Sequence, residues 1–247
     1  MFDKNEFRSL FIEIFEENGL VEYTTDNIIE KMYEMSDHML SINESMNLTA
    51  ITDTRGVIAK HLADSATVSR FIPKNAKVCD VGCGGGFPSL PLAIIRPDVT
   101  ILGLDSTEKR INYVNDSAKL LGLDNLTAIS GRAEDISRDK AYRECFDVCT
   151  ARAVASLPIL SELCIPFVKV GGKFVAMKGK FTDEEFNLSA KGCEKLGCEA
   201  LTDEKIHRFN LLTKDTSDER TIIELKKTKP TPVQYPRNYS QIKKKPL

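Results

Sequence analysis

Four glycines within five residues are the strongest chemical signal in this chain of 247 residues. They stand in the segment Asp80-Val-Gly-Cys-Gly-Gly-Gly-Phe-Pro88, between an apolar run that predicts a buried strand and a pattern that predicts a helix over 88–95. Glycine lets the backbone turn sharply and approach a ligand closely, and the free N–H groups at the start of the helix favour an anion. The segment therefore predicts a loop that binds a phosphate or a carboxylate.

Acidic residues follow the next two predicted strands. Asp105 stands 23 residues after Gly82, where a carboxylate can accept hydrogen bonds from a ribose. Farther along, Gly131-Arg-Ala-Glu134 offers backbone N–H groups and a carboxylate to an adenine edge. A dinucleotide fingerprint would need a third glycine where Phe87 stands, which counts against NAD. A nucleotide-dependent oxidoreductase nevertheless remains an alternative at this point.

Arg152 follows the fourth predicted strand directly, at the edge of the sheet where a substrate would approach a bound ligand. Its guanidinium can stack on a base or pair with a phosphate or a carboxylate, and an ion pair across the sheet edge is the alternative. His61 and Asp64 lie three residues apart on a helix predicted over 57–70. They could form an acid/base pair or a packing pair under the glycine loop. We nominate no general base.

Short β-branched runs alternate with helical patterns from residue 77 onward. Strands are predicted at 77–81, 99–104, 126–130, 146–151 and 173–178, with helices at 88–95, 107–121, 157–168 and 183–196. This alternation predicts an α/β fold with a doubly wound, mostly parallel sheet, whose carboxyl edge would carry the residues described above. Two more strands, at 205–210 and 220–225, have no room for a crossover helix between them and should form an antiparallel edge hairpin.

Charge is unevenly distributed, although the formal net charge is only -2. Residues 1–49 carry a net charge of -8 and two amphipathic patterns whose Phe and Met residues recur at helical spacing, which predicts helices with core contacts. Residues 226–247 carry +7 and four prolines, which predicts an extended tail. We divide the chain into a helical segment at 1–70, a ligand-binding domain at 71–228 and a basic, Pro-rich tail at 229–247.

Some classes of protein and site are disfavoured by composition. No apolar run approaches the ~18–20 residues of a membrane span, and the mixed charges of the first residues are unlike a secretory signal, so we expect a cytoplasmic protein. The seven cysteines should be reduced. The spacing of Cys79 with Cys83, and of Cys145 with Cys149, could suggest zinc. Each pair lies in or beside an apolar run, however, so we expect no metal site.

The glycine loop resembles the S-adenosylmethionine loop of class I methyltransferases. Together with other motifs it resembles one family, the bacterial 16S rRNA guanine-N7 methyltransferases called RsmG, formerly glucose-inhibited division protein B. The other motifs are Asn47-Leu-Thr-Ala-Ile51, His61-Leu-Ala-Asp-Ser65, Gly131-Arg-Ala-Glu134, Thr150-Ala-Arg-Ala-Val-Ala155, Lys178-Gly-Lys180, Tyr235-Pro-Arg237 and Lys243-Lys-Lys-Pro-Leu247. The family loop often has Ser or Thr in place of Cys83 and Ala in place of Gly85. Both differences are small, and we expect binding to survive them.

The resemblance implies methyl transfer from S-adenosylmethionine to N7 of a guanine in 16S rRNA of the small ribosomal subunit, guanosine 527 in the usual rRNA numbering. N7 presents a lone pair in the major groove and no proton has to leave, so catalysis can be largely positional. By the same resemblance, Asp105, Ser106 and Thr107 would serve the ribose, Ala133 and Glu134 the adenine, and Arg152 would close the site. The remaining cofactor-binding residues would be Asp80, Gly82, Gly84 and Phe87.

Basic residues supply candidates for RNA binding. Between residues 151 and 182 Glu162 is the only acid among five bases, and the tail is basic, so one side of the molecule could bind phosphates. The candidates are Arg132, Arg152, Lys178, Lys180, Arg237, Lys243, Lys244 and Lys245. We expect a monomer whose partner is 16S rRNA or the small subunit. A methyltransferase acting on another substrate, or a non-catalytic RNA-binding protein, would have the same fold.

Overall fold

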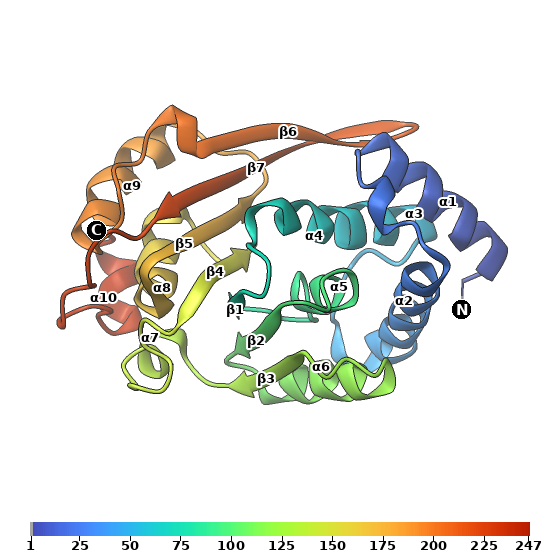
Figure 1. Cartoon of the computed structure of the whole chain (residues 1–247), viewed down its shortest axis with the longest axis horizontal. Helices are drawn as coiled ribbons and strands as arrows, with labels where there is room; N and C mark the ends of the chain where they lie inside the picture. The colour runs from blue at the N-terminus through green and yellow to red at the C-terminus, as the bar shows by residue number, and fades with distance from the viewer. Residues whose placement is uncertain (1) are drawn as a thin grey trace.

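The computed structural model describes residues 2–247. Seven strands form one sheet in the order β3-β2-β1-β4-β5-β7-β6 (Figure 1). The strands are β1 Lys77–Val81, β2 Thr100–Asp105, β3 Leu126–Ser130, β4 Phe146–Arg152, β5 Val168–Lys178, β6 Ile206–Thr213 and β7 Thr216–Lys226. β1 to β5 are parallel, and β7 runs antiparallel to both β5 and β6. The doubly wound sheet with an antiparallel edge hairpin is therefore confirmed.

Helices cover both faces of this sheet (Figure 1). They are α1 Lys4–Glu17, α2 Asp26–Met46, α3 Thr54–Val57, α4 Asp64–Thr67, α5 Ser89–Ile95, α6 Glu108–Leu120, α7 Ala133–Ile136, α8 Leu157–Cys164, α9 Asp183–Lys195 and α10 Tyr239–Lys244. Successive side chains of a strand point to opposite faces. Val78 accordingly packs in the core with α1, α2, α5 and α6, whereas Cys79 packs in the core with α8 and α9. β1 and β4 are neighbours at the centre, so the order of the strands reverses at the carboxyl end of β1, where open α/β sheets bind ligands.

The N-terminal helices α1 and α2 pack on the helices that cover one face of the sheet, through the apolar stripes predicted from their spacing. α1 buries Phe7, Phe11, Ile14 and Phe15, and the rings of Phe11 and Phe15 stack with centroids 3.9 Å apart. α2 buries Met32, Met35 and Met39 on the side that faces the same core. This N-terminal layer supports the segment from residue 47 to residue 64, which reaches the carboxyl edge of the sheet.

Several predicted elements differ from the structure: the strands expected at 173–178 and 220–225, for example, begin earlier, at Val168 and Thr216. The helix expected over 57–70 is interrupted by a π-helical turn, Ile58–Ala63, a distortion that often accompanies functional sites. The helix expected to reach residue 168 ends at Cys164, because Pro166 follows and β5 begins at Val168. The tail is not wholly extended, since α10 forms there and buries Ile242. Among the described residues, the helices are all too short or too polar to cross a bilayer.

Candidate active site

The glycine loop joins β1 to α5, and its glycines leave the backbone without side chains. Gly82 and Gly84 have φ angles of 74° and 53°, in the left-handed region that favours glycine. A Cβ on Gly82 would lie 2.5 Å from Cγ2 of Val154, so a larger residue there would require Val154 to move. A Cβ on Gly84 would find open space, with its nearest neighbour, the Gly82 carbonyl oxygen, 3.9 Å away. The loop therefore presents a backbone surface that a ligand can approach closely.

The end of β2 fixes this loop. The carbonyl oxygen of Leu104 accepts hydrogen bonds from the N–H groups of Gly82 at 2.7 Å and Cys83 at 3.0 Å. Asp105 Oδ2 accepts from the Gly84 N–H at 3.1 Å, while Oδ1 accepts from the Thr107 N–H at 2.8 Å. Each carboxylate oxygen has further acceptor capacity. Asp105 therefore braces the loop and can still accept a hydrogen bond from a ligand.

Asp80 is fully buried immediately before the loop. Its Oδ2 accepts a hydrogen bond from the Ser89 hydroxyl, while its Oδ1 has no partner. Burial raises the pKa of Asp80 to about 6, although Ser89 and Arg152 both favour the ionised form. Unsatisfied buried acceptors are rare in folded proteins. An unpaired acceptor beside a bare glycine loop fits a ligand such as S-adenosylmethionine, which carries both an ammonium and a carboxylate group.

Two cavities open at this edge of the sheet, and both are lined by Gly82 and Arg110. The smaller, which we call the Glu134 cavity, has a volume of about 210 Å³ and lies among the loops after β2 and β3. Its lining includes the predicted residues Asp105, Ser106, Thr107, Arg132, Ala133 and Glu134. The larger, which we call the Arg152 cavity, has a volume of about 490 Å³ and is lined by Gly84, Phe87 and Arg152 among others. The predicted cofactor-binding residues, except the fully buried Asp80, thus divide between two cavities that share Gly82 as a lining residue.

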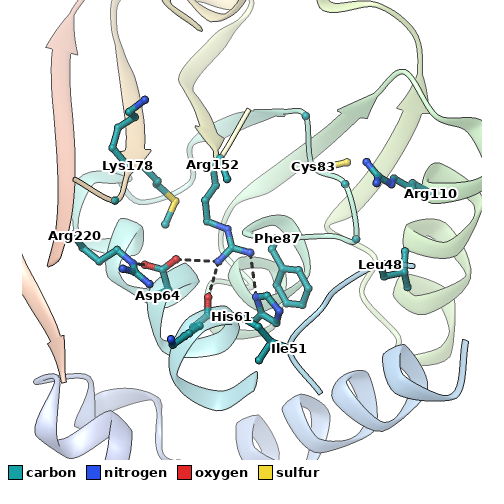
Figure 2. Close-up of a pocket in the computed structure, with 17 residues that line it drawn as sticks. Leu48, Ile51, His61, Asp64, Cys83, Phe87, Arg110, Arg152, Lys178 and Arg220 are labelled. Carbon is teal, nitrogen blue, oxygen red and sulfur yellow. Dashed lines mark hydrogen bonds and ion pairs between the residues drawn. The ribbon is translucent and has the colours of Figure 1, made fainter. Parts of the chain in front are cut away.

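Arg152 is held by a buried carboxylate inside the larger cavity (Figure 2). Its Nη1 donates to Asp64 Oδ2 and to the Lys60 carbonyl oxygen, both at 2.9 Å. Asp64 Oδ1 accepts a second guanidinium, from Arg220 Nε of β7, also at 2.9 Å. The Arg152 guanidinium also lies 5.2 Å from the centre of the Phe87 ring. Arg152 thus both forms the ion pair weighed as its alternative role and lines the cavity.

His61 and Asp64 do not form an acid/base pair. Burial, and then the positive charge of Arg152, lower the pKa of His61 to about 4, so its imidazole is neutral at pH 7. Its Nδ1 lies 3.5 Å from Arg152 Nη2, which can only donate, and its Nε2 lies 2.7 Å from Thr49 Oγ1. The Nε2–H therefore donates to Thr49. The imidazole also stacks on Phe87 at 4.6 Å, so His61 links three walls of the cavity.

The N-terminal loop is the main part of the site that reasoning from single residues missed. The Asn43 side chain pairs with both backbone groups of Thr49 at 2.9 Å, which fixes the loop after α2. Leu48 then packs against Gly85, where an added Cβ would be 3.5 Å from the Leu48 Cβ. The motif Asn47–Ile51 was the available signal. Other lining residues that were not predicted are Ile51, Lys60, Arg110, Met177 and Arg220.

Acids from other elements neutralise much of the basic stretch between residues 151 and 182. Lys169 pairs with Asp147 and Lys173 pairs with Glu224, each at 2.5 Å. Lys178 lines the Arg152 cavity but pairs with Glu185 at 2.8 Å, while Lys180 is exposed.

The RNA-binding candidates at the end of the chain differ in their surroundings. Lys243, Lys244 and Lys245 are exposed, as is Arg132 beside the Glu134 cavity. Arg237 instead binds the fully buried Glu162 through Nη2 at 2.6 Å and Nε at 2.9 Å. This pairing gives Arg237 a structural role and argues against its binding RNA.

Comparison with known proteins gives a consistent result. A family model described as rRNA small subunit methyltransferase G matches residues 28–212. A protein of Lactobacillus delbrueckii subsp. bulgaricus named Ribosomal RNA small subunit methyltransferase G is 43% identical over 213 residues, which cover 85% of this chain and 87% of the relative. The protein of the same name from Acetivibrio thermocellus is 41% identical over 246 residues, 99% of each chain.

Solved structures show the same fold at low sequence identity. M. jannaschii TYW2, solved in complex with AdoMet, superposes with a TM-score of 0.54 at 16% identity, covering 72% of this chain and 79% of that one. A SAM-dependent O-methyltransferase from Thermotoga maritima has a TM-score of 0.50 at 16% identity, covering 80% of this chain and 73% of that one. At this identity the likeness concerns the fold alone.

Proposed function

The chain belongs to the family of rRNA small subunit methyltransferase G, and from this premise we propose that it methylates N7 of a guanine in 16S rRNA, guanosine 527 in the usual numbering. The methyl donor is S-adenosylmethionine. The family favours this reading over a nucleotide-dependent oxidoreductase. We further propose that the enzyme acts as a monomer on the small ribosomal subunit or its rRNA in the cytoplasm.

The observation that carries the proposal is that Gly82 lines both cavities. The Glu134 cavity offers carboxylates, hydroxyls and backbone groups to a nucleoside, with Asp105, Ser106 and Thr107 beside the ribose and Ala133 and Glu134 beside the adenine. The bare loop at Gly82 and Gly84 receives the methionyl part, next to Asp80 and Phe87. When bound, S-adenosylmethionine supplies a methyl group that its sulfonium has already activated. The Arg152 cavity receives the guanine.

The side chains around Arg152 suit a reaction that needs no general base. Both oxygens of Asp64 accept guanidinium groups, and Nδ1 of His61 faces Arg152. Guanine N7 has a free lone pair, so no proton must be removed before it attacks. The task of these residues is to orient the base, and correct positioning alone can lower the activation barrier substantially. Arg152, held by Asp64 at the edge of the sheet, contacts the base or an adjacent phosphate and closes the site.

Exposed bases near the cavities provide the phosphate contacts. Arg132 lies beside the Glu134 cavity, Lys180 follows β5, and α10 carries Lys243 and Lys244 with Lys245 after it, whereas Lys178 is part-buried and paired with Glu185. Such contacts are electrostatic, so binding should weaken steeply as salt increases. We exclude Arg237 from the phosphate contacts because its guanidinium forms an ion pair with Glu162.

The test uses ribosomal particles from a strain that lacks this protein. Particles, or 16S rRNA extracted from them, are incubated with the enzyme and methyl-labelled S-adenosylmethionine, and the labelled nucleotide is mapped. We expect one 7-methylguanosine, at guanosine 527. Label on another atom or nucleotide, or no label from an enzyme that binds the cofactor, would refute the proposed specificity.

A further inference from the structure

The last residues of the chain reach the cavity assigned to the nucleoside. We call residues 229–247 the C-terminal strap, and one of its residues, Tyr239 at the start of α10, lines the Glu134 cavity. We propose that the Tyr239 ring contacts the adenine of bound S-adenosylmethionine, so that the strap forms part of the cofactor site. This inference rests on the proposed function, which puts the adenine in that cavity.

The strap is fastened to the same helix that lines the cavity. Glu162 of α8 is fully buried and accepts from the Arg237 backbone N–H at 2.8 Å as well as from its guanidinium. The next residue of α8, Leu163, lines the cavity. Tyr239 follows Arg237 by two residues, so the ion pair fixes the backbone close to Tyr239 beside the cavity.

A second set of contacts holds the strap on the side of α7. Arg138, just after α7, donates to the Pro236 carbonyl oxygen. Arg143 donates to the carbonyl oxygens of Thr231 at 2.8 Å and Tyr235 at 2.9 Å. Ile242, one turn after Tyr239, is fully buried. The strap is therefore fixed before and after Tyr239, and ordering this ring on ligand binding should cost little conformational entropy.

The position and chemistry of the ring suit a purine. Tyr239 is the one aromatic side chain among the described residues that line the Glu134 cavity. The Arg132 guanidinium lies 5.9 Å from its ring centre, and Arg132 directly precedes Ala133 and Glu134, the residues assigned to the adenine. An aromatic ring offers a purine a flat apolar surface, while the adjacent hydroxyls and carboxylates can bind its polar groups.

The experiment measures equilibrium binding of S-adenosylmethionine and S-adenosylhomocysteine to the full chain by titration calorimetry. Tyr239→Ala should weaken both ligands by about tenfold, within the range found for aromatic contacts with bases, because both carry the same adenosine. Tyr239→Phe should bind within about twofold of the unmodified chain, since it keeps the ring. Gln241→Ala is the matched control, because Gln241 is exposed on the same short helix and does not line the cavity.

The alternative to a direct contact is that Tyr239 only stabilises the strap. Tyr239→Leu separates the two, because leucine keeps apolar bulk without the flat ring. If Tyr239 contacts adenine, Tyr239→Leu binds both ligands about as weakly as Tyr239→Ala while its melting temperature without ligand stays near that of the unmodified chain. Binding by Tyr239→Leu or Tyr239→Ala as tight as that of the unmodified chain would overturn this inference alone. Failure of the unmodified chain to bind either ligand would instead refute the proposed function.

Discussion

The two cavities at the carboxyl edge of the sheet are built in different ways. The Glu134 cavity is formed largely by loops that each follow their own strand, β1, β2 or β3. The Arg152 cavity is assembled from the N-terminal loop, the π-helical turn, β4, β5 and β7, and the buried carboxylate of Asp64 links β4 to β7. From this difference we expect binding of the methyl donor to depend on local backbone geometry. Positioning of the guanine that accepts the methyl group should instead depend on ion pairs between residues far apart in the sequence. The two functions should therefore be separable by mutation.

The largest effect is expected at the glycine loop. Gly84→Asp should abolish measurable binding of S-adenosylmethionine, because the new carboxylate would enter the open space where the cofactor's own carboxylate is expected and would face Asp105 nearby. Titration calorimetry measures the loss. Gly122→Asp is the control, since Gly122 also has a positive φ and open space around it but lies at the end of α6. Near-native affinity in Gly84→Asp would refute the location of the methionyl group.

The second effect should leave donor binding largely intact. Arg152→Ala should reduce methyl transfer by about 100-fold, the scale expected when reacting groups are misplaced. Its affinity for S-adenosylmethionine and its melting temperature should change much less, because Asp64 keeps the Arg220 partner. The measurement pairs single-turnover rates with thermal unfolding. A collapse in melting temperature, with the remaining folded protein fully active, would show that Arg152 serves only the fold.

A smaller effect is expected where the N-terminal loop joins the network. Thr49→Val keeps the shape but removes the acceptor of the His61 Nε2–H and of the Ile51 N–H. Loss of such bonds costs about 1 kcal/mol, so methyl transfer should fall by about three- to tenfold with little change in cofactor affinity. Thr49→Ser, which keeps the hydroxyl, should retain activity. An unchanged rate of methyl transfer in Thr49→Val would mean that this loop does not position the guanine.

The smallest effect concerns pH. In the folded protein the pKa of His61 is lowered to about 4 by burial and then by Arg152, against an ordinary value of 6.5. The unfolded chain therefore takes up a proton first, and the His61 contribution to stability, complete above pH 6.5, is lost as the pH falls from 6.5 toward 4. Urea unfolding of the unmodified chain and of His61→Gln at pH 7 and pH 5 measures this loss. The free energy of unfolding of the unmodified chain, minus that of His61→Gln, should be smaller at pH 5 than at pH 7. An equal value at both pH values would contradict this prediction.

The contrast between the locally built Glu134 cavity and the Arg152 cavity explains how much of the site the sequence could predict. The glycine loop, Asp105 and Glu134 are each adjacent in sequence to the strand that positions them, so the alternation of strands and helices was enough to bring them together. Arg152 was predicted for the same reason. Its partner Asp64 lies 88 residues away, and Asp64 lies 156 residues from Arg220. Spacing carries no information about pairs so distant in sequence, because tertiary packing determines them.

The tail illustrates a second limit. Its charge and prolines predicted an extended segment that holds several candidate RNA-binding bases, yet Arg237 pairs with Glu162 and Ile242 is buried in the core with α8 and α9. Composition describes the average behaviour of such a segment. It could not show that a buried carboxylate on α8 would hold one of the seven bases.

The most direct test of this account is a crystal structure of the protein with S-adenosylhomocysteine. We expect the adenine in the Glu134 cavity beside Ala133 and Glu134, the homocysteine end over Gly82 and Gly84, and the sulfur directed toward the Arg152 cavity. A ligand bound in the reverse orientation, or bound elsewhere with the Glu134 cavity empty, would contradict the division between a donor cavity and an acceptor cavity.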